Sequence, residues 1–287
     1  MCRGHEATAM NIEPFTAGIL PGRAAFRIDG PEARHFLHNL LTADIEGLKP
    51  GNATYAALLT PQGKILFDMF VFDTGAAFLV DCSAAQRADL IKRLTFYKLR
   101  AKLSIVDLRD HDVGASPQLP PQELRYRDPR SPDMGWRFFV PRGTLPQAEG
   151  YNAVRIGLGL ADTDADLGSG EFFPHEANLD QLGGVSFEKG CYVGQEVVSR
   201  MEHRGMARSR ILPVRLGSEA PAKGTDIRAG GKAIGTLLSS FDSAALALLR
   251  LDRLAETTEP LLTEGVSLEV LKPSWVRYDV PNAKAMA

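Results

Sequence analysis

The stretch FEKGCYVGQEVVSRMEHRG, residues 187–205, holds one cysteine beside a glycine and leads into a segment with helical spacing. Cys191 follows Gly190 directly, and Gly194 comes three residues later. Glycine permits a close backbone approach or a positive φ, so we expect this cysteine on a tight turn where its thiol is reachable. A buried, inert cysteine is the alternative reading of the same residues.

Several cations lie close to this cysteine in the sequence. Lys189 precedes Cys191 by two positions, while Arg200 and His203 follow it. Any of them folded beside the thiol would favour the thiolate, the form that attacks electrophiles and binds metals. From GQEVVSRMEHR we predict a helix, in which Glu196 and Arg200 are an i,i+4 pair whose plainest role is a salt bridge.

Working outward toward the N-terminus, the apolar spacing predicts an α+β region. RAAFRIDG (23–30) alternates as a strand, and PEARHFLHNLLTADI (31–45) has helical spacing. The next segments predict three antiparallel strands over 52–82, a helix over 83–100 and a strand over 101–108. Residues 114–135, rich in Pro and charge, read as a surface excursion, and 136–141 and 151–160 read as strands.

Past Gly205 the pattern changes to short β-like runs separated by Gly, Pro and acidic turns. Such spacing is typical of a small β-barrel or sandwich. We therefore predict two domains, an α+β region over 1–205 and a C-terminal β-barrel over 206–287.

Composition narrows the function classes. The 287 residues include 33 Lys and Arg against 35 Asp and Glu, a net charge of −2, which disfavours nucleic acid as a partner. No apolar run is long enough to span a bilayer, and the first residues lack a signal or transit pattern, so we expect a cytoplasmic protein with no membrane partner. Cys2, Cys82 and Cys191 form no CxxC pair, which argues against a disulfide framework or a zinc site.

Other candidate residues carry weaker signals. Asp68 interrupts the apolar strand ILFDMFVF and must either face solvent or line a pocket. His175 lies in a polar cluster, FFPHEANLD, that is more typical of a turn than of catalysis. His35 and His38 have no third ligand at a suitable spacing. The segment GLGLADTDADLGSG lacks the spacing of a nucleotide-binding loop.

The motif KGCYVGQE, with Arg200 beyond it, resembles the signature of the YgfZ family, folate-binding proteins that assist iron–sulfur cluster assembly. The blocks RIDGPEARHFLHNLLTADI, LLTPQGKILFDMFVF and YKLRAKLSIVD are similar to earlier blocks of that family in the same order. More distantly the chain resembles the T-protein of the glycine cleavage system, an aminomethyltransferase. T-protein has a pair of aspartates where this sequence reads Phe67-Asp68, and it lacks the cysteine signature.

The resemblance implies a ring-like α+β region of two intertwined, ferredoxin-like halves that binds tetrahydrofolate in a central hole, followed by a β-barrel. It gives Cys191 the functional role and Tyr151 a place for stacking on the folate ring; Arg23 stands at a second such place. The residues that it implies for the folate site are Arg23, Asp68, Tyr151, Lys189, Gly190, Tyr192, Gly194, Gln195, Glu196 and Arg200. No metal ligand is assigned.

These observations support one leading hypothesis and two alternatives. The first is a tetrahydrofolate-binding accessory factor for assembling or repairing iron–sulfur clusters, with assembly proteins and client enzymes as partners. There Cys191 could ligate iron, attack a sulfur or mixed disulfide, or accept a one-carbon unit. The second is a folate-dependent one-carbon transferase in which Asp68 orients or protonates the leaving nitrogen. The third is a folate-sensing scaffold without an essential thiol.

Overall fold

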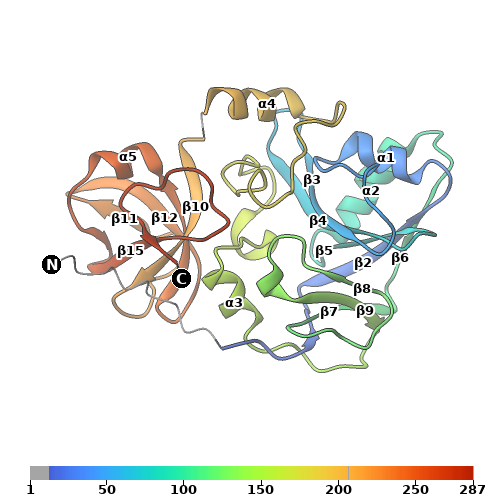
Figure 1. Ribbon diagram of the computed structural model, residues 1–287, viewed down its shortest axis with the longest axis horizontal. Helices are drawn as coiled ribbons and strands as arrows, with labels where there is room; N and C mark the ends of the chain where they lie inside the picture. Colours follow the sequence, from blue (N-terminus) through green and yellow to red (C-terminus); the bar gives the residue numbers. More distant parts are fainter. Residues whose placement is uncertain (1–12, 206, 287) are drawn as a thin grey trace.

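The computed structural model describes residues 13–205 and 207–286, which form three sheets (Figure 1). A five-stranded antiparallel sheet in the order β3-β4-β5-β2-β6 lies on the right of the view, beside a smaller sheet, and a barrel lies on the left. The strands of the five-stranded sheet are β2 (Arg23–Asp29), β3 (Ala53–Leu59), β4 (Ile65–Asp73), β5 (Phe78–Ser83) and β6 (Ser104–Asp107).

Both faces of the five-stranded sheet are buried. Phe67, Met69 and Val71 of β4 pack under α1 (Ala33–Leu40) and α2 (Arg87–Lys98), while Phe70 and Phe72 point into the opposite core. Because successive side chains of a strand point to opposite faces, a strand covered on both sides reads as the unbroken apolar run found here. The helices predicted over 31–45 and 83–100 and the strands between them are confirmed, although α1 is shorter than predicted.

The prediction of a surface excursion over 114–135 was wrong. This segment contributes to a four-stranded sheet, β1-β7-β9-β8, and to a 3₁₀ helix at Pro132–Met134. The strands are β1 (Gly18–Ile19), β7 (His111–Ser116), β8 (Arg125–Arg127) and β9 (Trp136–Pro141). Asp128 and Arg130 are buried there because they pair with each other at 2.8 Å, which the composition of the segment does not reveal.

The strand predicted over 151–160 was also wrong, since the segment forms helix α3 (Tyr151–Gly157). Gly150 begins it with a left-handed φ of 80°. The helix packs between the central core and barrel strands and buries Arg155 through an ion pair with Asp166 at 2.8 Å. A helix covered on most sides lacks the one-sided apolar pattern that would identify it. A π-helix at Thr163–Leu167 follows, and α4 (Gln195–Arg204) is the helix predicted after Gly194.

The C-terminal strands form a closed barrel. The sheet order β10-β13-β12-β11-β14-β15 returns on itself through pairing of β10 with β15, and β16 adds to β15. A closed barrel leaves none of its six strands with a free edge. The elements are β10 (Ser209–Leu216), β11 (Asp226–Ala229), β12 (Lys232–Phe241), β13 (Ala244–Arg250), α5 (Leu251–Glu256), β14 (Leu261–Thr263), β15 (Val266–Lys272) and β16 (Lys284–Ala285). The barrel is confirmed, while the boundary at residue 206 stays a prediction.

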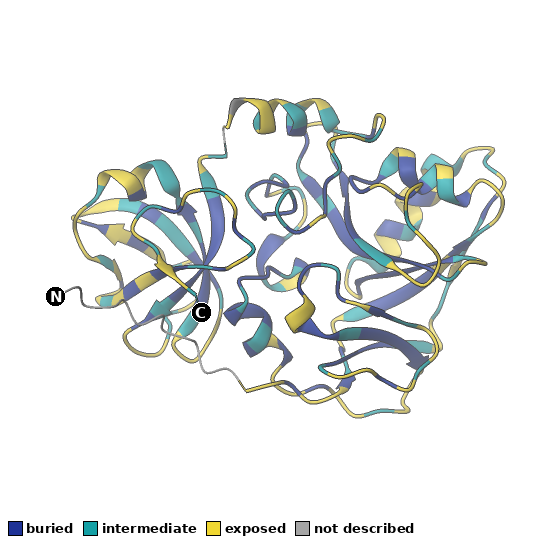
Figure 2. Ribbon diagram, in the orientation of Figure 1, coloured by how far each residue is buried: buried dark blue, intermediate teal, exposed yellow. Residues whose placement is uncertain are grey.

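A buried network of charges joins the two N-terminal sheets. Arg137 of β9 donates to Asp81 of β5 at 2.5 Å and to Asp128 at 3.0 Å. Arg23 of β2 binds the other oxygen of Asp81 at 2.7 Å. Burial opposes ionisation of Asp81, but these two guanidinium groups outweigh it and lower the pKa of the carboxyl. Figure 2 shows that the strands around this network are buried along most of their length. Within the described residues no helix is long and apolar enough to cross a membrane.

Replacing Arg137 with Met should lower the free energy of unfolding by about 3–5 kcal/mol, because one partner of a buried ionic network is removed. Urea denaturation followed by circular dichroism measures the change. The matched control is Arg109→Met, which removes a guanidinium whose side chain is 80% exposed and pairs with Asp107. That control should change stability by no more than about 0.5 kcal/mol. Equal effects of the two variants would contradict the structural role of the network.

Candidate functional site

The loop that carries Cys191 is held against the turn between β3 and β4. Gly194 has a φ of 82°, and a Cβ on it would lie 2.6 Å from the carbonyl oxygen of Thr60 and 3.0 Å from Cα of Gly63. Gly63 in turn leaves room for Val197 of α4. Both glycines therefore permit a backbone contact that a larger residue would prevent. Gly190 has open space around it, and the Cys191 side chain is exposed.

Lys189 fixes the other side of this loop. Its ammonium group donates to the carbonyl oxygens of His38, Leu41 at 2.6 Å and Ala43 at 3.1 Å, where α1 ends. Carbonyl groups at a helix C-terminus attract a cation. Burial lowers the pKa of Lys189 to about 8, while the nearby carboxylates of Asp44 and Glu46 oppose that shift. Lys189, one of the three cations that could have favoured the Cys191 thiolate, is thus engaged with carbonyl groups at the end of α1.

Arg200, Tyr192 and Gln195 of the signature differ in their surroundings. Arg200 donates to Glu196 at 2.6 Å on the exposed side of α4, which is the predicted i,i+4 salt bridge. Tyr192 is buried under the loop, the Lys189 ammonium lies 5.1 Å from its ring centre, and burial raises its pKa to about 12. Within the described residues its buried hydroxyl has no hydrogen-bond partner. Gln195 begins α4.

A separate cavity of about 820 Å³ contains the two residues that the resemblance places against folate. Arg23 and Tyr151 both line it, together with Asp162 and, from the barrel, Phe241. The hydroxyl of Tyr151 accepts a hydrogen bond from Arg137 at 2.5 Å, so the network between the sheets holds this ring in place. The other residues that line the cavity are Leu20, Pro21, Gly22, Gln147, Ala148, Glu149, Gly150, Asn152, Ala153, Asp164 and Ala165.

Asp68 is in neither of the two positions expected from the sequence. It is buried and accepts hydrogen bonds from Tyr55 at 2.8 Å and from Thr163. Burial, together with the charge of Asp68, raises the pKa of Tyr55, which keeps that phenol protonated as a donor. Asp68 does not line the cavity. Its hydrogen-bond partner Thr163 is next in sequence to Asp162, which does line the cavity.

The predicted site residues thus fall into two groups. In Figure 1 the segment before α4 lies at the top of the view, whereas α3, which carries Tyr151, lies toward the bottom. None of the signature residues from Lys189 to Arg200 lines the described cavity. Their assignment to a folate site stays a prediction, and the structure does not bring Cys191 together with Arg23 and Tyr151.

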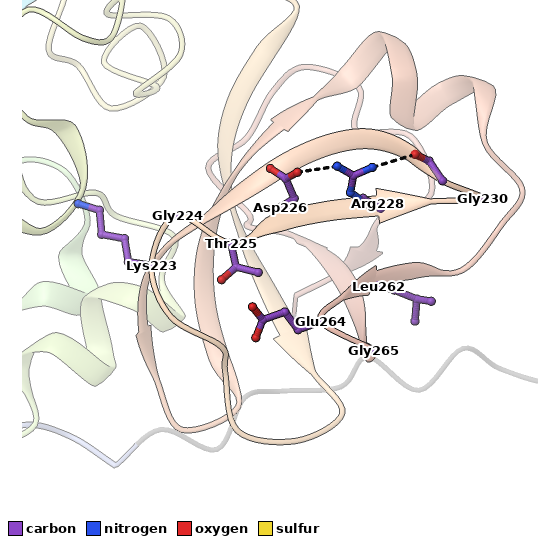
Figure 3. A pocket seen from close by; sticks show the side chains of 10 residues that line it. Lys223, Gly224, Thr225, Asp226, Arg228, Gly230, Leu262, Glu264 and Gly265 are labelled. Atoms are coloured by element: carbon purple, nitrogen blue, oxygen red, sulfur yellow. Dashed lines mark hydrogen bonds and ion pairs between the residues drawn. The ribbon is translucent and has the colours of Figure 1, made fainter.

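Two other polar groups are candidate sites, one around His175 and one in a hollow at the barrel. His175 and Glu202 are 3.0 Å apart, and Asp180 completes a group whose ligand atoms all lie within 4.8 Å of one another. Arg210 donates to Asp180 at 2.6 Å, so a side-chain cation already balances that carboxylate. A hollow of about 750 Å³ at the barrel is shown in Figure 3. Its main polar pair, Asp226 and Arg228, is about half exposed to solvent, as suits surface residues.

Comparisons with known proteins agree on the architecture. Residues 22–113 match the GCVT N-terminal domain, and residues 208–278 match the CAF17 C-terminal beta-barrel domain. A crystal structure of glycine cleavage system aminomethyltransferase T from Bartonella henselae superposes with a TM-score of 0.75 at 17% identity, covering 94% of this chain and 88% of that one. The predicted T-protein-like region with a C-terminal barrel is confirmed.

Similar curated proteins include two mammalian iron-sulfur cluster assembly factors. The mouse protein IBA57, mitochondrial, is 31% identical over 91% of this chain and 85% of its own length. The human protein of the same name is 30% identical over 96% of this chain and 90% of its own length. A homologue from Chaetomium globosum is 31% identical over 88% of this chain and 75% of its own length.

The predicted cytoplasmic location is contradicted by these relatives, each of which is named as mitochondrial. That prediction depended on the first residues of the chain, and residues 1–12, with Cys2 among them, lie outside the described residues.

Replacing Gly194 with Ala should destabilise the signature loop, because a left-handed residue with a side chain costs about 1–2 kcal/mol and this one also meets the Thr60 carbonyl. We expect a lower thermal midpoint and an altered rate of Cys191 alkylation by iodoacetamide. Gly190→Ala is the matched control, since its Cβ would enter open space. If both variants behave like the wild type, the glycine contact does not position the loop.

Proposed function

Because the chain belongs to the family of iron–sulfur cluster assembly factors that includes the mouse and human IBA57 proteins, we propose that it assists the assembly or repair of iron–sulfur clusters. The observation that carries the proposal is the exposed Cys191 on a loop fixed from two sides, by Gly194 and Lys189. The loop would act as in the YgfZ-type proteins whose signature it resembles. Its partners would be cluster assembly proteins and client enzymes.

The chemistry of a single exposed thiol limits what this protein does with a cluster. As the thiolate, Cys191 would ligate iron or attack a disulfide, forming a mixed disulfide as the second sulfur leaves as a thiolate. The other cysteine in the described residues, Cys82, is buried, and burial raises its pKa to about 12, so it stays an inert thiol. An ordinary cluster needs four cysteine ligands, so one chain holds a cluster only together with a partner and transiently.

Replacing Cys191 with Ser should abolish rescue of an iron–sulfur enzyme in cells that lack their own factor of this family. The thiol is the group that we propose reacts, and serine is a poor iron ligand. The enzyme activity per unit of its polypeptide is the measurement, taken under oxidative stress. Cys82→Ala is the control and should rescue, because that thiol is buried in the core. Equal rescue by Cys191→Ser and the wild type would instead support the scaffold hypothesis.

We further propose that the cavity between α3, β2 and the barrel binds tetrahydrofolate. Its volume of about 820 Å³ is in the range of small-molecule sites. Tyr151 and Phe241 offer aromatic surface to a ring, Asp162 and Asp164 offer carboxylates to the N–H groups of a pterin, and Arg23 offers a cation. Tetrahydrofolate supplies a carrier for one-carbon units when bound. The residues present fit this group.

Replacing Phe241 with Ala should weaken tetrahydrofolate binding about tenfold, because an aromatic wall of the cavity is lost. Isothermal titration calorimetry of the whole chain under anaerobic conditions gives the dissociation constant. Phe241 is 48% exposed, so the variant should fold. Leu262→Ala removes a similarly exposed apolar side chain from the same barrel but outside the cavity, and should bind normally. Equal affinity of both variants would place folate elsewhere.

The alternative of a one-carbon transferase is less well supported by the geometry. Asp68, the residue expected to orient or protonate the leaving nitrogen, is held inside the core by Tyr55 and Thr163. Cys191 is outside the cavity, so it is not placed to accept a one-carbon unit from a folate bound there. Folate turnover without any cluster protein, lost in Asp68→Asn, would favour this alternative over assembly.

A further inference from the structure

The C-terminal end of α2 exposes two large apolar side chains on a surface that the proposed function does not use. Phe96 is 71% exposed and Leu99 is 85% exposed. Lys92 and Phe96 are spaced i and i+4, so they lie on one face of α2, and Leu99 directly follows the last residue of the helix. Leu90 and Leu94 of the same helix are buried in the core. Single exposed apolar residues are common on soluble proteins, whereas two large ones near the end of one helix favour a binding surface.

The same segment concentrates positive charge. Between Leu90 and Val106 the chain has five cations and no acidic residue, although the whole protein has a net charge of −2. These cations are Lys92, Arg93, Lys98, Arg100 and Lys102. Over the described residues none of the five side chains forms an ion pair or hydrogen bond with another residue. Glu32 accepts a hydrogen bond from the backbone N–H of Lys102 at 2.6 Å, and Asp89 lies in the first turn of α2. The charges are therefore available to a partner.

The backbone at this end is held in an uncommon conformation. Leu99 has φ 47° and ψ −106°, although it is not a glycine. Such a conformation is strained for a residue that has a side chain and persists only where the surrounding structure maintains it. Here it ends α2 and turns the chain toward β6, leaving the leucine side chain in solvent. Folding gains nothing from the exposure of Leu99, so a binding role accounts for it better than packing.

We propose that this α2 patch, comprising Lys92, Arg93, Phe96, Lys98, Leu99, Arg100 and Lys102, is a docking site for an acidic face of a partner protein. Aromatic and arginine side chains are enriched at protein interfaces, and the cations would steer and orient a carboxylate-rich partner. Because the whole chain has a net charge of −2, its positive charge is confined to a local patch, which fits a partner face of similar size better than an extended polyanion.

The patch and the signature loop are connected through α1, although the patch is not part of the loop. Lys189 ties the loop to the end of α1, and α1 and α2 pack on the same face of the five-stranded sheet through one hydrophobic core. Figure 1 shows both helices at the right of the molecule, and Figure 2 shows exposed segments on them. The inference goes beyond the proposed function and rests on it only for the choice of an iron–sulfur protein as probe.

The test measures binding of the full chain to an acidic plant-type ferredoxin in its apo form, by isothermal titration calorimetry at low and at physiological ionic strength. We expect binding that weakens with salt, and that weakens at least about tenfold in the double variant Phe96→Ser, Leu99→Ser. Lys92→Glu with Arg93→Glu should reduce the salt dependence, because two of the five cations of the patch are reversed. Leu262→Ser, on the barrel and 43% exposed, is the control and should bind like the wild type.

Three results would overturn the docking proposal. These are no binding of ferredoxin by the wild type at low salt, equal binding by the Phe96→Ser, Leu99→Ser variant, and stronger patch-dependent binding to phosphatidylglycerol vesicles than to ferredoxin. The result of the ferredoxin-binding test can be distinguished from the result of the rescue test for the proposed function. If the patch binds as expected but the wild type fails to rescue the iron–sulfur enzyme, the assembly role fails and the patch stands. Rescue without patch-dependent binding gives the reverse conclusion.

Discussion

The guanidinium of Arg137 is the constraint on which the N-terminal architecture depends. It reaches from the four-stranded sheet to Asp81 of the five-stranded sheet, to Asp128 of the loop after β8, and to the hydroxyl of Tyr151 on α3. Two buried carboxylates would repel each other if left unpaired, so the sheets can approach only with the guanidinium groups between them. Phe70 packs beneath, with its ring centre 4.1 Å from the Arg137 guanidinium carbon.

This network also shapes the cavity. Arg23 is held by Asp81 at one wall, and Tyr151 is held by Arg137 at another. Both side chains are therefore preorganised before any ligand arrives, which reduces the ordering cost of binding. The barrel contributes Phe241, so the cavity depends on contacts between segments far apart in the chain.

The signature loop is held by backbone contacts rather than by buried ion pairs. Its anchors are a close contact between Gly194 and the β3–β4 turn and a set of carbonyl groups that receive the Lys189 ammonium. Gly194 and Lys189 therefore position the loop, and the Cys191 side chain is exposed. A rigid loop presenting one reactive atom suits transfer between proteins, in which the partner supplies the remaining ligands.

The sequence by itself determined much of the secondary structure. The apolar run of β4, the helical spacing of α1 and α2, the salt bridge of Glu196 with Arg200 and the short C-terminal strands are local patterns, and local patterns survive folding when one face or both are buried. For Cys191 the neighbouring glycines left both an exposed and a buried position open, and the structure shows the exposed one. The fold as a whole came from the resemblance carried by the signature and earlier blocks.

Only the tertiary structure decided how these parts serve a site. The charged segment around Asp128 and Arg130 reads as a loop because its sequence does not show that each charge meets its partner in the core. The helix α3 reads as a strand because protein covers it on most sides and erases its one-sided pattern. No local sequence pattern predicts that Cys191 lies apart from Arg23 and Tyr151. Their separation depends on the long-range packing of α3, the sheets and the barrel. Spacing along a chain specifies neighbours within an element, whereas distances between elements are set by which buried charges and apolar faces must meet.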